Sequence, residues 1–534
     1  MARVKTNNLF AIQLKGLKLL FITLLSVSPL LSYSQKKLEI IHAGSLRFDE
    51  SLGNGAKRLI KDVEMKHEDV LMFCDSAYFY SDNTLEAFSR VHIQQNDTIH
   101  IYGDHLKYNG NDKKAIITGN VVVHKGNMQL FTNMLNYDLS SSVGYYTDKG
   151  RIIDKENVLT SQQGYLYSIT NDLYFKQDVV LTHQAKEEKK PGFVINCDTM
   201  RYSTSTKITY FYGPTTIKSD NSLIYCEDGW YNTNNELSRF SKNSYIIKDK
   251  QKMFGDTVFY NGEKNIGEAF TNVQIIDTAE HTIIKGDYAI HYESRDLSII
   301  TGNALLIKIF ETDTLFLHAD TLKAFGENQK QKTENRKHKR VETEKADTNH
   351  LLFAYHKVKF FKSDLQGKCD SMVYSIKDST MKLFGKPVFW STENQLTADS
   401  AVIYTGNKTI KSLELKHNAF IASQKDSVHY NQIRGKKMHG FFKNNKLYLI
   451  KAKGNGQTIY YVEDGGQLTG VNRAECSNLD IYLEDQKINR IVFITKPDAT
   501  LYPLEKIDVT EFRLKGFKWR MKERPLKSSD VFVW

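Results

Sequence analysis

Proline is scarce in this sequence, with 7 residues among 534, and the composition as a whole is not that of a disordered or fibrous chain. Hydrophobic residues make up 40% and charged residues 25%, which excludes disorder and collagen and leaves ample material for a core. Aromatic residues make up 12%, mostly tyrosine and phenylalanine. Because aromatic and β-branched residues favour strands over helices, the composition predicts an all-β protein.

Motifs for catalysis are also missing. The sequence contains no Gly-x-Ser-x-Gly elbow, phosphate-binding loop, His-Glu-x-x-His or Cys-x-x-Cys motif. Its 16 histidines are scattered without the spacing of metal ligands. The net charge is +11, but no arginine-rich groove or aromatic nucleic-acid motif accompanies it. We therefore expect no enzyme activity, no catalytic residues, no cofactor, no metal and no nucleic-acid partner.

The first 34 residues differ from the rest of the chain. A basic stretch without acidic residues precedes an apolar run over residues 19–31, and small residues then flank Tyr33. This order is typical of a secretory signal. An uncleaved anchor is the alternative, but an apolar run that contains Pro29 is short for a membrane span of about 20 residues. We predict a cleaved signal peptide over residues 1–34. Lipid attachment at the cleavage site is not expected, because no cysteine precedes Cys74.

An internal repeat runs through the remaining chain. A polar residue, usually Asp, follows a small residue and in most copies precedes a tyrosine by four positions. Most neighbouring copies lie 29 residues apart, a period that indicates a stacked architecture. The recurring polar residues are Asp75, Asp104, Asn133, Gln162, Asp198, Glu227, Asp256, Asp287, Asp320, Asp370 and Asp399.

Two turns punctuate each copy, for example residues 109–112 and 124–127. Each copy is therefore predicted to form two antiparallel strands of about ten residues. The apolar residues up to Ile101 and those from Leu106 onward differ in parity, so a bulge or corner is expected at the intervening Asp104. Such a corner would fold each strand across two packed layers, and Asp side chains would satisfy local backbone donors there. Paired carboxylates for glycoside chemistry are the less favoured interpretation.

Four of the five cysteines occupy the small position before the recurring acidic residue, namely Cys74, Cys197, Cys226 and Cys369. Glycine and alanine occupy the same position in other copies, so we expect a small, buried slot. Equivalent strands in neighbouring copies would lie about 9.6 Å apart, beyond the disulfide reach of about 7 Å. The sequence therefore predicts free thiols, and Cys476 fits the same pattern.

The recurring pattern Gly/Cys/Ala-Asp-x-x-x-Tyr, followed by a turn and a Gly-Asn-Val type strand such as residues 118–124, resembles the OstA/LptA family. These are periplasmic lipopolysaccharide-transport proteins and the related N-terminal domain of the outer-membrane lipopolysaccharide translocon. The opening segments 57–63 and 69–76 also resemble OstA-like proteins of the Bacteroidetes type. The resemblance covers nearly the whole chain after residue 34. One departure is size, since the compact transport protein of this family is far shorter than 500 residues.

The resemblance implies an all-β, extended OstA/LptA-like β-jellyroll in the periplasm, with association with the outer membrane as a further option. It implies lipopolysaccharide or its lipid A part as ligand, with acyl chains held in an apolar groove. Like-folded transport components would dock at the open edge strands, which also allow a homo-oligomer. The candidate groove-lining residues are Leu106, Tyr108, Val121, Val123, Leu135 and Tyr137.

Three alternatives remain at this stage. Plain core packing is the alternative role of each lining candidate. A structural envelope or surface protein would share the repeats and the signal peptide but would have a filled core and no lipid ligand. A β-helix carbohydrate enzyme would need a cleft with clustered acids, which the sequence does not contain.

Two charged interruptions suggest how the array is divided. Residues 184–192 are expected to form a solvated loop, and residues 326–350, rich in charge and without aromatics, a disordered one. Within the second loop, residues 336–340 are basic, and phosphate binding there is a less favoured hypothesis. The predicted organisation is a first array at 35–325, this loop, a second array at 351–510, and a cap or docking tail at 511–534.

Overall fold

The computed structural model describes residues 37–48, 55–184, 192–219, 222–325, 351–375, 377–406, 409–443, 446–484 and 487–534. The predicted signal peptide and the charged loop 326–350 lie outside these residues, as does most of the loop 184–192. Within the described ranges, every regular element is a strand apart from four short 3-10 helices. The all-β prediction is thus confirmed. The chain divides into two compact units, and one of the boundaries between them, at residues 133 and 134, falls within a strand.

The first unit contains residues up to 126 together with 134–141. Two short strands, β1 and β2, pair with the two halves of β3. The strands are β1 (Glu39–His42), β2 (Ser45–Phe48), β3 (Lys57–His67), β4 (Val70–Phe79), β5 (Thr84–Gln95), β6 (Ile99–Asn109), β7 (Lys114–Lys125) and part of β8 (Met128–Asp138).

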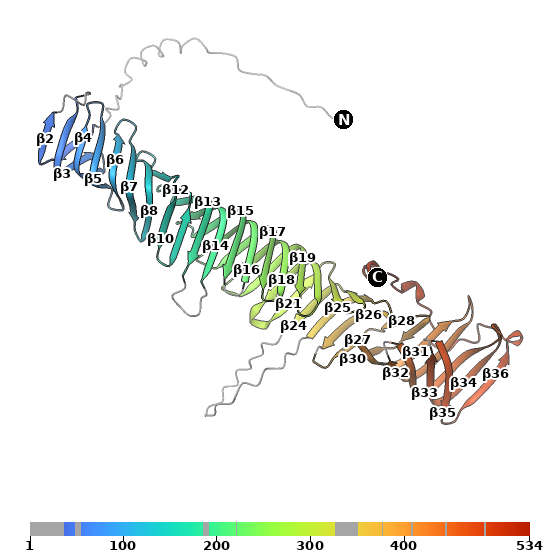
Figure 1. The fold of residues 1–534 in the computed structure, drawn as a ribbon. Coiled ribbons are helices and arrows are strands. Elements are labelled where there is room, and N and C mark those ends of the chain that lie inside the picture. The colour runs from blue at the N-terminus through green and yellow to red at the C-terminus, as the bar shows by residue number, and fades with distance from the viewer. Residues whose placement is uncertain are drawn as a thin grey trace, which may run out of the picture. The chain divides into compact units, whose positions relative to one another are not determined.

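The second unit contains the beginning of β8 and everything from residue 142 onward. Figure 1 shows its strands following one another in chain order. They are β9 (Val143–Tyr146), β10 (Gly150–Asp154), β11 (Asn157–Ser161), β12 (Gln163–Tyr167), β13 (Asp172–His183), β14 (Phe193–Ser203), β15 (Ile208–Ser219), β16 (Ser222–Asn232), β17 (Leu237–Lys248), β18 (Gln251–Asn261), β19 (Ile266–Asp277), β20 (Thr282–Tyr292), β21 (Leu297–Thr301), β22 (Leu305–Ile309), β23 (Thr314–His318), β24 (Thr321–Phe325), β25 (Leu351–Phe361), β26 (Gln366–Ser375), β27 (Thr380–Phe384), β28 (Val388–Ser391), β29 (Asn394–Thr397), β30 (Ser400–Gly406), β31 (Thr409–Gln424), β32 (Tyr430–Lys443), β33 (Lys446–Asp464), β34 (Gln467–Glu484), β35 (Lys487–Ile494) and β36 (Asp498–Pro503).

The long strands form antiparallel pairs joined by tight turns at the predicted places. The β6–β7 ladder ends at Asn109 and Lys114, on either side of a predicted turn. The β5–β6 ladder ends in the same way at Gln95 and Ile99. In the second unit β24 and β25 also pair, so the sheet continues from residue 325 to residue 351.

Each long strand bends at a bulge near its middle. Opposite Asp104 of β6, the pairing skips two residues of β5, Ser89 and Arg90, whose φ angles are 62° and 49°. Thr271 and Asn272 of β19 have φ angles of 58° and 54° at the equivalent interruption. The corner therefore lies at the predicted position, but the extra residue belongs to the facing strand. Two consecutive left-handed residues give this strand its sharp bend.

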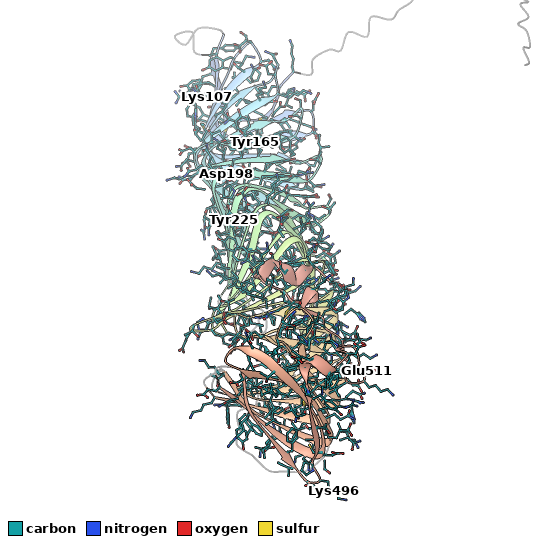
Figure 2. All side chains as sticks on the ribbon, turned by 90° about the vertical axis from the view of Figure 1, so that its right-hand side faces the viewer. Lys107, Tyr165, Asp198, Tyr225, Lys496 and Glu511 are labelled. Atoms are coloured by element: carbon teal, nitrogen blue, oxygen red, sulfur yellow. The ribbon has the colours of Figure 1, made fainter. Side chains whose placement is uncertain are left out.

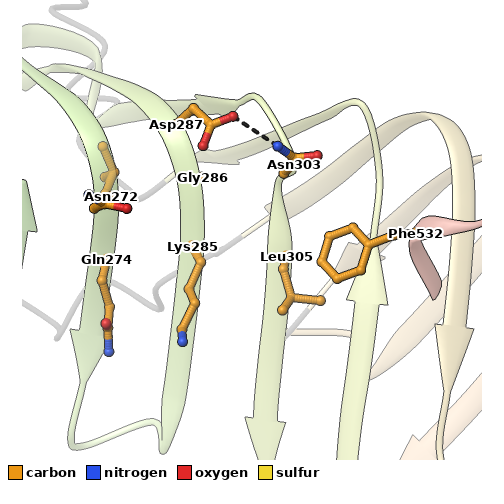
Figure 3. A pocket seen from close by; sticks show the side chains of 9 residues that line it. Asn272, Gln274, Lys285, Gly286, Asp287, Asn303, Leu305 and Phe532 are labelled. Carbon is orange, nitrogen blue, oxygen red and sulfur yellow. Dashed lines mark hydrogen bonds between the residues drawn. The ribbon is translucent and has the colours of Figure 1, made fainter. Parts of the chain in front are cut away.

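The recurring carboxylates accept hydrogen bonds from amide side chains. Asn303 donates through Nδ2 to Asp287 Oδ2 at 2.9 Å (Figure 3), and Asn272 donates to Asp256 at the same distance. The expected partners were backbone donors, whereas the observed partners are asparagines 16 residues further along the chain. These contacts are exposed and tie neighbouring corners together. The geometry gives the aspartates a structural role.

The corners divide every repeat into two layers with a shared core. We call the segments that end at turns such as 109–112 the first layer, and those that end at turns such as 95–98 the second layer. In the second unit, one buried cluster contains Val258 and Ala269 of the first layer and Val273 of the second. All three are at most 2% exposed. The inner faces of both layers therefore pack against each other.

Tyr146 occupies a tightly packed site in this core. Its side chain is fully buried, and its hydroxyl lies 2.7 Å from Ser161 Oγ. The ring lies directly against two glycines, Gly150 of β10 and Gly164 of β12. A Cβ atom at Gly150 would lie 2.2 Å from Cζ of Tyr146, and one at Gly164 would lie 2.4 Å from the ring. Both positions therefore require glycine for close approach rather than for a special φ.

Gly150→Ala should lower the free energy of unfolding by about 1–3 kcal/mol, because the added methyl group must displace a buried ring. Gly267→Ala is a matched control within a strand of the same unit. Its Cβ would have Tyr260 Cδ2 as nearest neighbour, at 3.9 Å. Urea unfolding of both variants, followed by circular dichroism, measures the difference. Equal stability of the two variants would contradict this packing argument.

After β36 the chain leaves the sheet and runs back over the outer face of the second layer. We call residues 504–534 the C-terminal strap; it contains the 3-10 helices η3 (Leu504–Lys506), η4 (Met521–Glu523) and η5 (Ser528–Phe532). Phe512 and Leu514 of the strap share a buried cluster with Phe420 of β31 and Tyr461 of β33. The strap explains why β31 buries four consecutive residues, 419–422, instead of alternate ones.

Three buried glutamines hold the strap, and they lie on a single row across the sheet. The register runs from Gln366 through Trp390, Gln395 and Ala422 to Gln432. The glutamines are at most 2% exposed, and each forms a hydrogen bond to the strap. The strap is thus docked in a defined register. Figure 2 labels Glu511, which directly precedes its first buried residue.

Candidate functional site

The six predicted lining residues all lie in the first unit and point into its interior. Leu106 pairs with Ile117 on the first layer, and Val123 pairs with Ile101 on the second. Such burial places the side chains against other protein atoms rather than solvent, so their contact with lipid stays a prediction. The exposed fractions are 0% for Leu106, 2% for Tyr108, 1% for Val121, 6% for Val123, 1% for Leu135 and 5% for Tyr137.

The two tyrosines among them bridge the layers of the first unit. Tyr108 OH lies 2.5 Å from His67 Nδ1, and Tyr137 OH donates to Gln95 Oε1 at 2.5 Å. His67 and Gln95 end second-layer segments, whereas the tyrosines end first-layer segments. Burial, together with the nearby Glu68, raises the pKa of Tyr108, so its hydroxyl keeps its proton. These hydrogen bonds connect the two layers of the first unit at the side opposite its corners.

A different set of residues forms a less deeply buried part of the apolar interior. On the second layer of the second unit, inward side chains align in register across successive strands and are half-buried. The register pairs Ile217 with Ile224, Ile246 with Met253, and Ile275 with Ile284. It also pairs Ile224 with Ile246 and Met253 with Ile275, so the six residues form one continuous row. We call this set the isoleucine row: Ile217, Ile224, Ile246, Met253, Ile275 and Ile284.

Within these strands, the inward side chains become more exposed with distance from the corner. Next to the corner, the inward positions of these strands hold small or short side chains, such as Cys226 and Ser244, that are at most 2% exposed. Two residues further from the corner, Ile224 and Ile246 are half-buried. The equivalent residues of the first unit are more deeply buried, with Ile101 at 1%. The second unit therefore offers apolar surface where the first unit is closed.

Tyr231 of β16 and Tyr260 of β18 occupy the same repeat position as the first-unit tyrosines, but their polar neighbours differ. Burial raises the pKa of Tyr231 and Tyr260, and the carboxylates of Glu236 and Glu293, respectively, raise it further. Both carboxylates belong to first-layer turns, the layer that holds the tyrosines themselves. In the first unit, by contrast, the partners come from the opposite layer. This difference fits the greater exposure of the isoleucine row.

The outer face of the same strands is aromatic. Tyr225, labelled in Figure 2, stacks on Tyr245 with ring centroids 5.1 Å apart. Each is adjacent in sequence to a member of the isoleucine row, Ile224 or Ile246, and so points to the opposite face of the sheet. These neighbours provide outward positions against which the inward row can be tested.

One described cavity lies on the outer side of the second unit. It has a volume of about 290 Å³, and its walls include Lys285, Asp287 and Leu305. Phe532 of the strap closes one end beside Leu305 (Figure 3). The cavity is therefore separate from the isoleucine row and borders the end of the strap.

All five cysteines are buried and free, as predicted. Burial, followed by the adjacent aspartate, raises the pKa of Cys74 and Cys369 to about 12. The thiols of Cys197 and Cys226 also have pKa values of about 12, chiefly because they are buried. The corner slots therefore hold protonated thiols at neutral pH.

These thiols should react with a disulfide reagent only after the protein unfolds. Their ordinary pKa is 9.0, so between pH 9 and 12 the folded state binds protons more tightly than the unfolded state. The stabilisation is complete below about pH 9 and should be lost progressively as the pH rises towards 12. Labelling in native buffer and in denaturant at about pH 8 measures the protection. Equal labelling rates in the two conditions would contradict the buried assignment.

No helix in the described part of the chain is long and apolar enough to cross a membrane. Within the same ranges, no group of three or more His, Cys, Asp or Glu side chains is arranged to hold a metal ion.

Two protein families match the sequence over different parts. The OstA-like protein family matches residues 35–190. The family described as LptA/(LptD N-terminal domain) LPS transport protein matches residues 216–409. No curated protein matches the chain. Among solved structures, a similar chain is LptH from Pseudomonas aeruginosa, described as the LptA homologous periplasmic component of the conserved lipopolysaccharide transport device. It is 11% identical and has a TM-score of 0.16, over 27% of this chain and 82% of that one.

The family matches together cover more than half of the 534 residues. They coincide with the antiparallel strands that bend at a corner in each repeat. The predicted fold class, an OstA/LptA-like β-jellyroll, is confirmed. The chain belongs to the OstA/LptA-like family.

Proposed function

We propose that the protein is a non-enzymatic periplasmic bridge in lipopolysaccharide transport to the outer membrane, with acyl chains held against the isoleucine row. The single observation that carries this proposal is the row itself, an inward and half-buried apolar surface that continues in register over six strands. The match to a family described as an LPS transport protein supports the choice of ligand.

The row suits an acyl chain for two physical reasons. Each methylene group removed from water contributes about 0.8 kcal/mol, so a chain lying along several strands is held firmly. Neighbouring members of the row lie about 4.8 Å apart and are chemically alike. A lipid can therefore move from one position to the next with little net change in free energy, as a conduit requires.

The closed interior of the first unit favours a second candidate function for that part, a rigid spacer with a filled core. For Leu106, Val121 and Leu135 to contact lipid, the layers must separate and the hydrogen bonds of Tyr108 and Tyr137 must break. The lining role first inferred for these residues thus requires an opening step that the isoleucine row does not.

Open edges offer docking sites for partners. Among the described strands, β1 and β2 pair only with β3, and β35 and β36 pair only with β34. Their unpaired backbone groups can extend the sheet into a like-folded transport component or a second copy of the chain.

Photocrosslinking in the native envelope tests this function. A photoreactive residue at position 253 points into the row, and one at position 252 points outward from the same strand. We expect crosslinked lipopolysaccharide, identified by mass spectrometry, at position 253 and none at 252. Position 121 reports whether the first unit also opens.

Absence of lipid at position 253 in a folded protein would overturn lipid transport and leave the spacer function. Equal crosslinking at positions 252 and 253 would show unspecific capture, and it would also contradict the proposal. Crosslinking at 253 without crosslinking at 121 would restrict the conduit to the second unit.

A further inference from the structure

The C-terminal strap has a buried side and an exposed side of different chemistry. Its buried side contains Phe512 and Leu514, which pack on the sheet. Its exposed side contains four lysines within thirteen residues: Lys515, Lys518, Lys522 and Lys527. A basic ridge therefore follows the outside of the strap.

By contrast, the arginines of the strap bind other groups of the protein. Arg524 donates to Gln366 Oε1 at 2.8 Å, and Arg520 forms two hydrogen bonds of 2.7 Å to Glu523. Arg513 lies over the rings of Tyr430 and Phe517 at 4.7 Å. The guanidinium groups thus fix the strap to itself and to the sheet, whereas no described carboxylate forms an ion pair with Lys515, Lys518 or Lys522.

Large apolar side chains are exposed beside this ridge. Leu526 is 76% exposed, the highest value among the large apolar side chains in the described ranges, and Val533 is 66% exposed. Trp534 and Phe532 are 51% and 43% exposed. Four such residues within nine positions mark an interaction surface, since soluble proteins seldom leave large apolar side chains together in water.

We propose that the exposed side of the strap docks on the surface of an anionic phospholipid membrane. Lysine ammonium groups on flexible stems are attracted to anionic headgroups within about one Debye length. Leucine, valine and tryptophan can enter the boundary between headgroups and acyl chains, where tryptophan is favoured.

The strap is already ordered for this contact. Gln395 and Gln432 each bond two of its backbone groups, and Lys368 Nζ bonds Glu523 at 2.7 Å. Docking therefore does not involve the loss of conformational entropy that ordering a flexible tail would require. The proposal is independent of lipid in the isoleucine row, because the strap lies on the outer face of the sheet.

Vesicle co-sedimentation of the full chain without its predicted signal peptide tests the proposal. The probes are vesicles of phosphatidylcholine alone and vesicles that also contain phosphatidylglycerol. We expect at least about tenfold stronger binding to the anionic vesicles, weakening as salt is added. The variant K515S/K518S/K522S/K527S should lose this preference, and L526S/V533S should weaken binding at every salt concentration.

A charge-matched control removes four exposed lysines elsewhere in the second unit, as K248S/K250S/K252S/K264S. It should bind like the unaltered protein. Equal loss in both lysine variants would overturn the strap as the site and indicate only net charge. Absence of binding to either vesicle, or full displacement from the vesicles by millimolar inorganic phosphate at constant ionic strength, would also overturn the proposal. Hydrogen exchange of the strap in each variant shows whether the strap still packs on the sheet.

Discussion

Ile246→Asp should abolish lipid capture by the second unit while leaving the fold intact. The side chain lies in the middle of the isoleucine row and is half-buried, so a carboxylate can reach water without unfolding the sheet. In the bound state, however, an acyl chain would cover that carboxylate, and burial of an unpaired charge is strongly unfavourable. We expect lipopolysaccharide crosslinking at position 275 to fall at least about tenfold.

The adjacent residue provides a matched control. Ile247 is also a half-buried isoleucine of β17, but it pairs along the outer face of the second layer, with Lys252 of β18. Ile247→Asp should therefore keep the crosslink at position 275. Undiminished crosslinking in Ile246→Asp, or equal loss in both variants, would contradict the assignment of the row. Circular dichroism verifies that both variants are folded.

The strand architecture could be predicted because its signals are local and repeated. The turn at 109–112 and the parity change across Asp104 depend on residues close in sequence, and the spacing of 29 repeats them. The bulge itself was placed on the wrong strand of the pair. On β5 the two left-handed residues are Ser89 and Arg90, which do not indicate such angles. On β7, the other neighbour of Asp104, they are Gly119 and Asn120, which do.

The isoleucine row escaped prediction because these strands are apolar on both faces. Ile246 and Ile247 are adjacent, so alternation does not indicate which one points inward. The position within the repeat nevertheless indicates which residue points inward. Counting two residues back from the small corner residue identifies Ile224 before Cys226 and Met253 before Gly255.

The remaining contacts join residues far apart in sequence. Tyr108 and Tyr137 were predicted as lining residues on their spacing alone, but their hydroxyls meet partners 41 and 42 residues away. The attachment of the strap to the sheet depends on hydrogen bonds between residues such as Gln432 and Leu514, which are 82 positions apart in the sequence. No local pattern encodes such pairs, which follow from how the layers stack.

Gln432→Ala should release the strap and destabilise the second unit by about 2–5 kcal/mol, because two buried backbone groups lose their partners. Gln432 is fully buried; its Nε2 donates to Phe512 O at 3.0 Å, and its Oε1 accepts from Leu514 N–H at 2.8 Å. Alanine removes both bonds and leaves a cavity under the strap. Faster hydrogen exchange over residues 510–520, measured by mass spectrometry, would report the release.

Gln424→Ala is the control, because this glutamine at the end of β31 is exposed and bonds only residues of the adjoining turn and Tyr430. Its substitution should leave exchange in the strap unchanged. Unchanged exchange in Gln432→Ala would show that apolar packing alone holds the strap. Since Phe420 and Tyr461 lie beneath Phe512 and Leu514, release should also uncover an apolar patch on the sheet. We therefore expect Gln432→Ala to aggregate more readily on heating than Gln424→Ala.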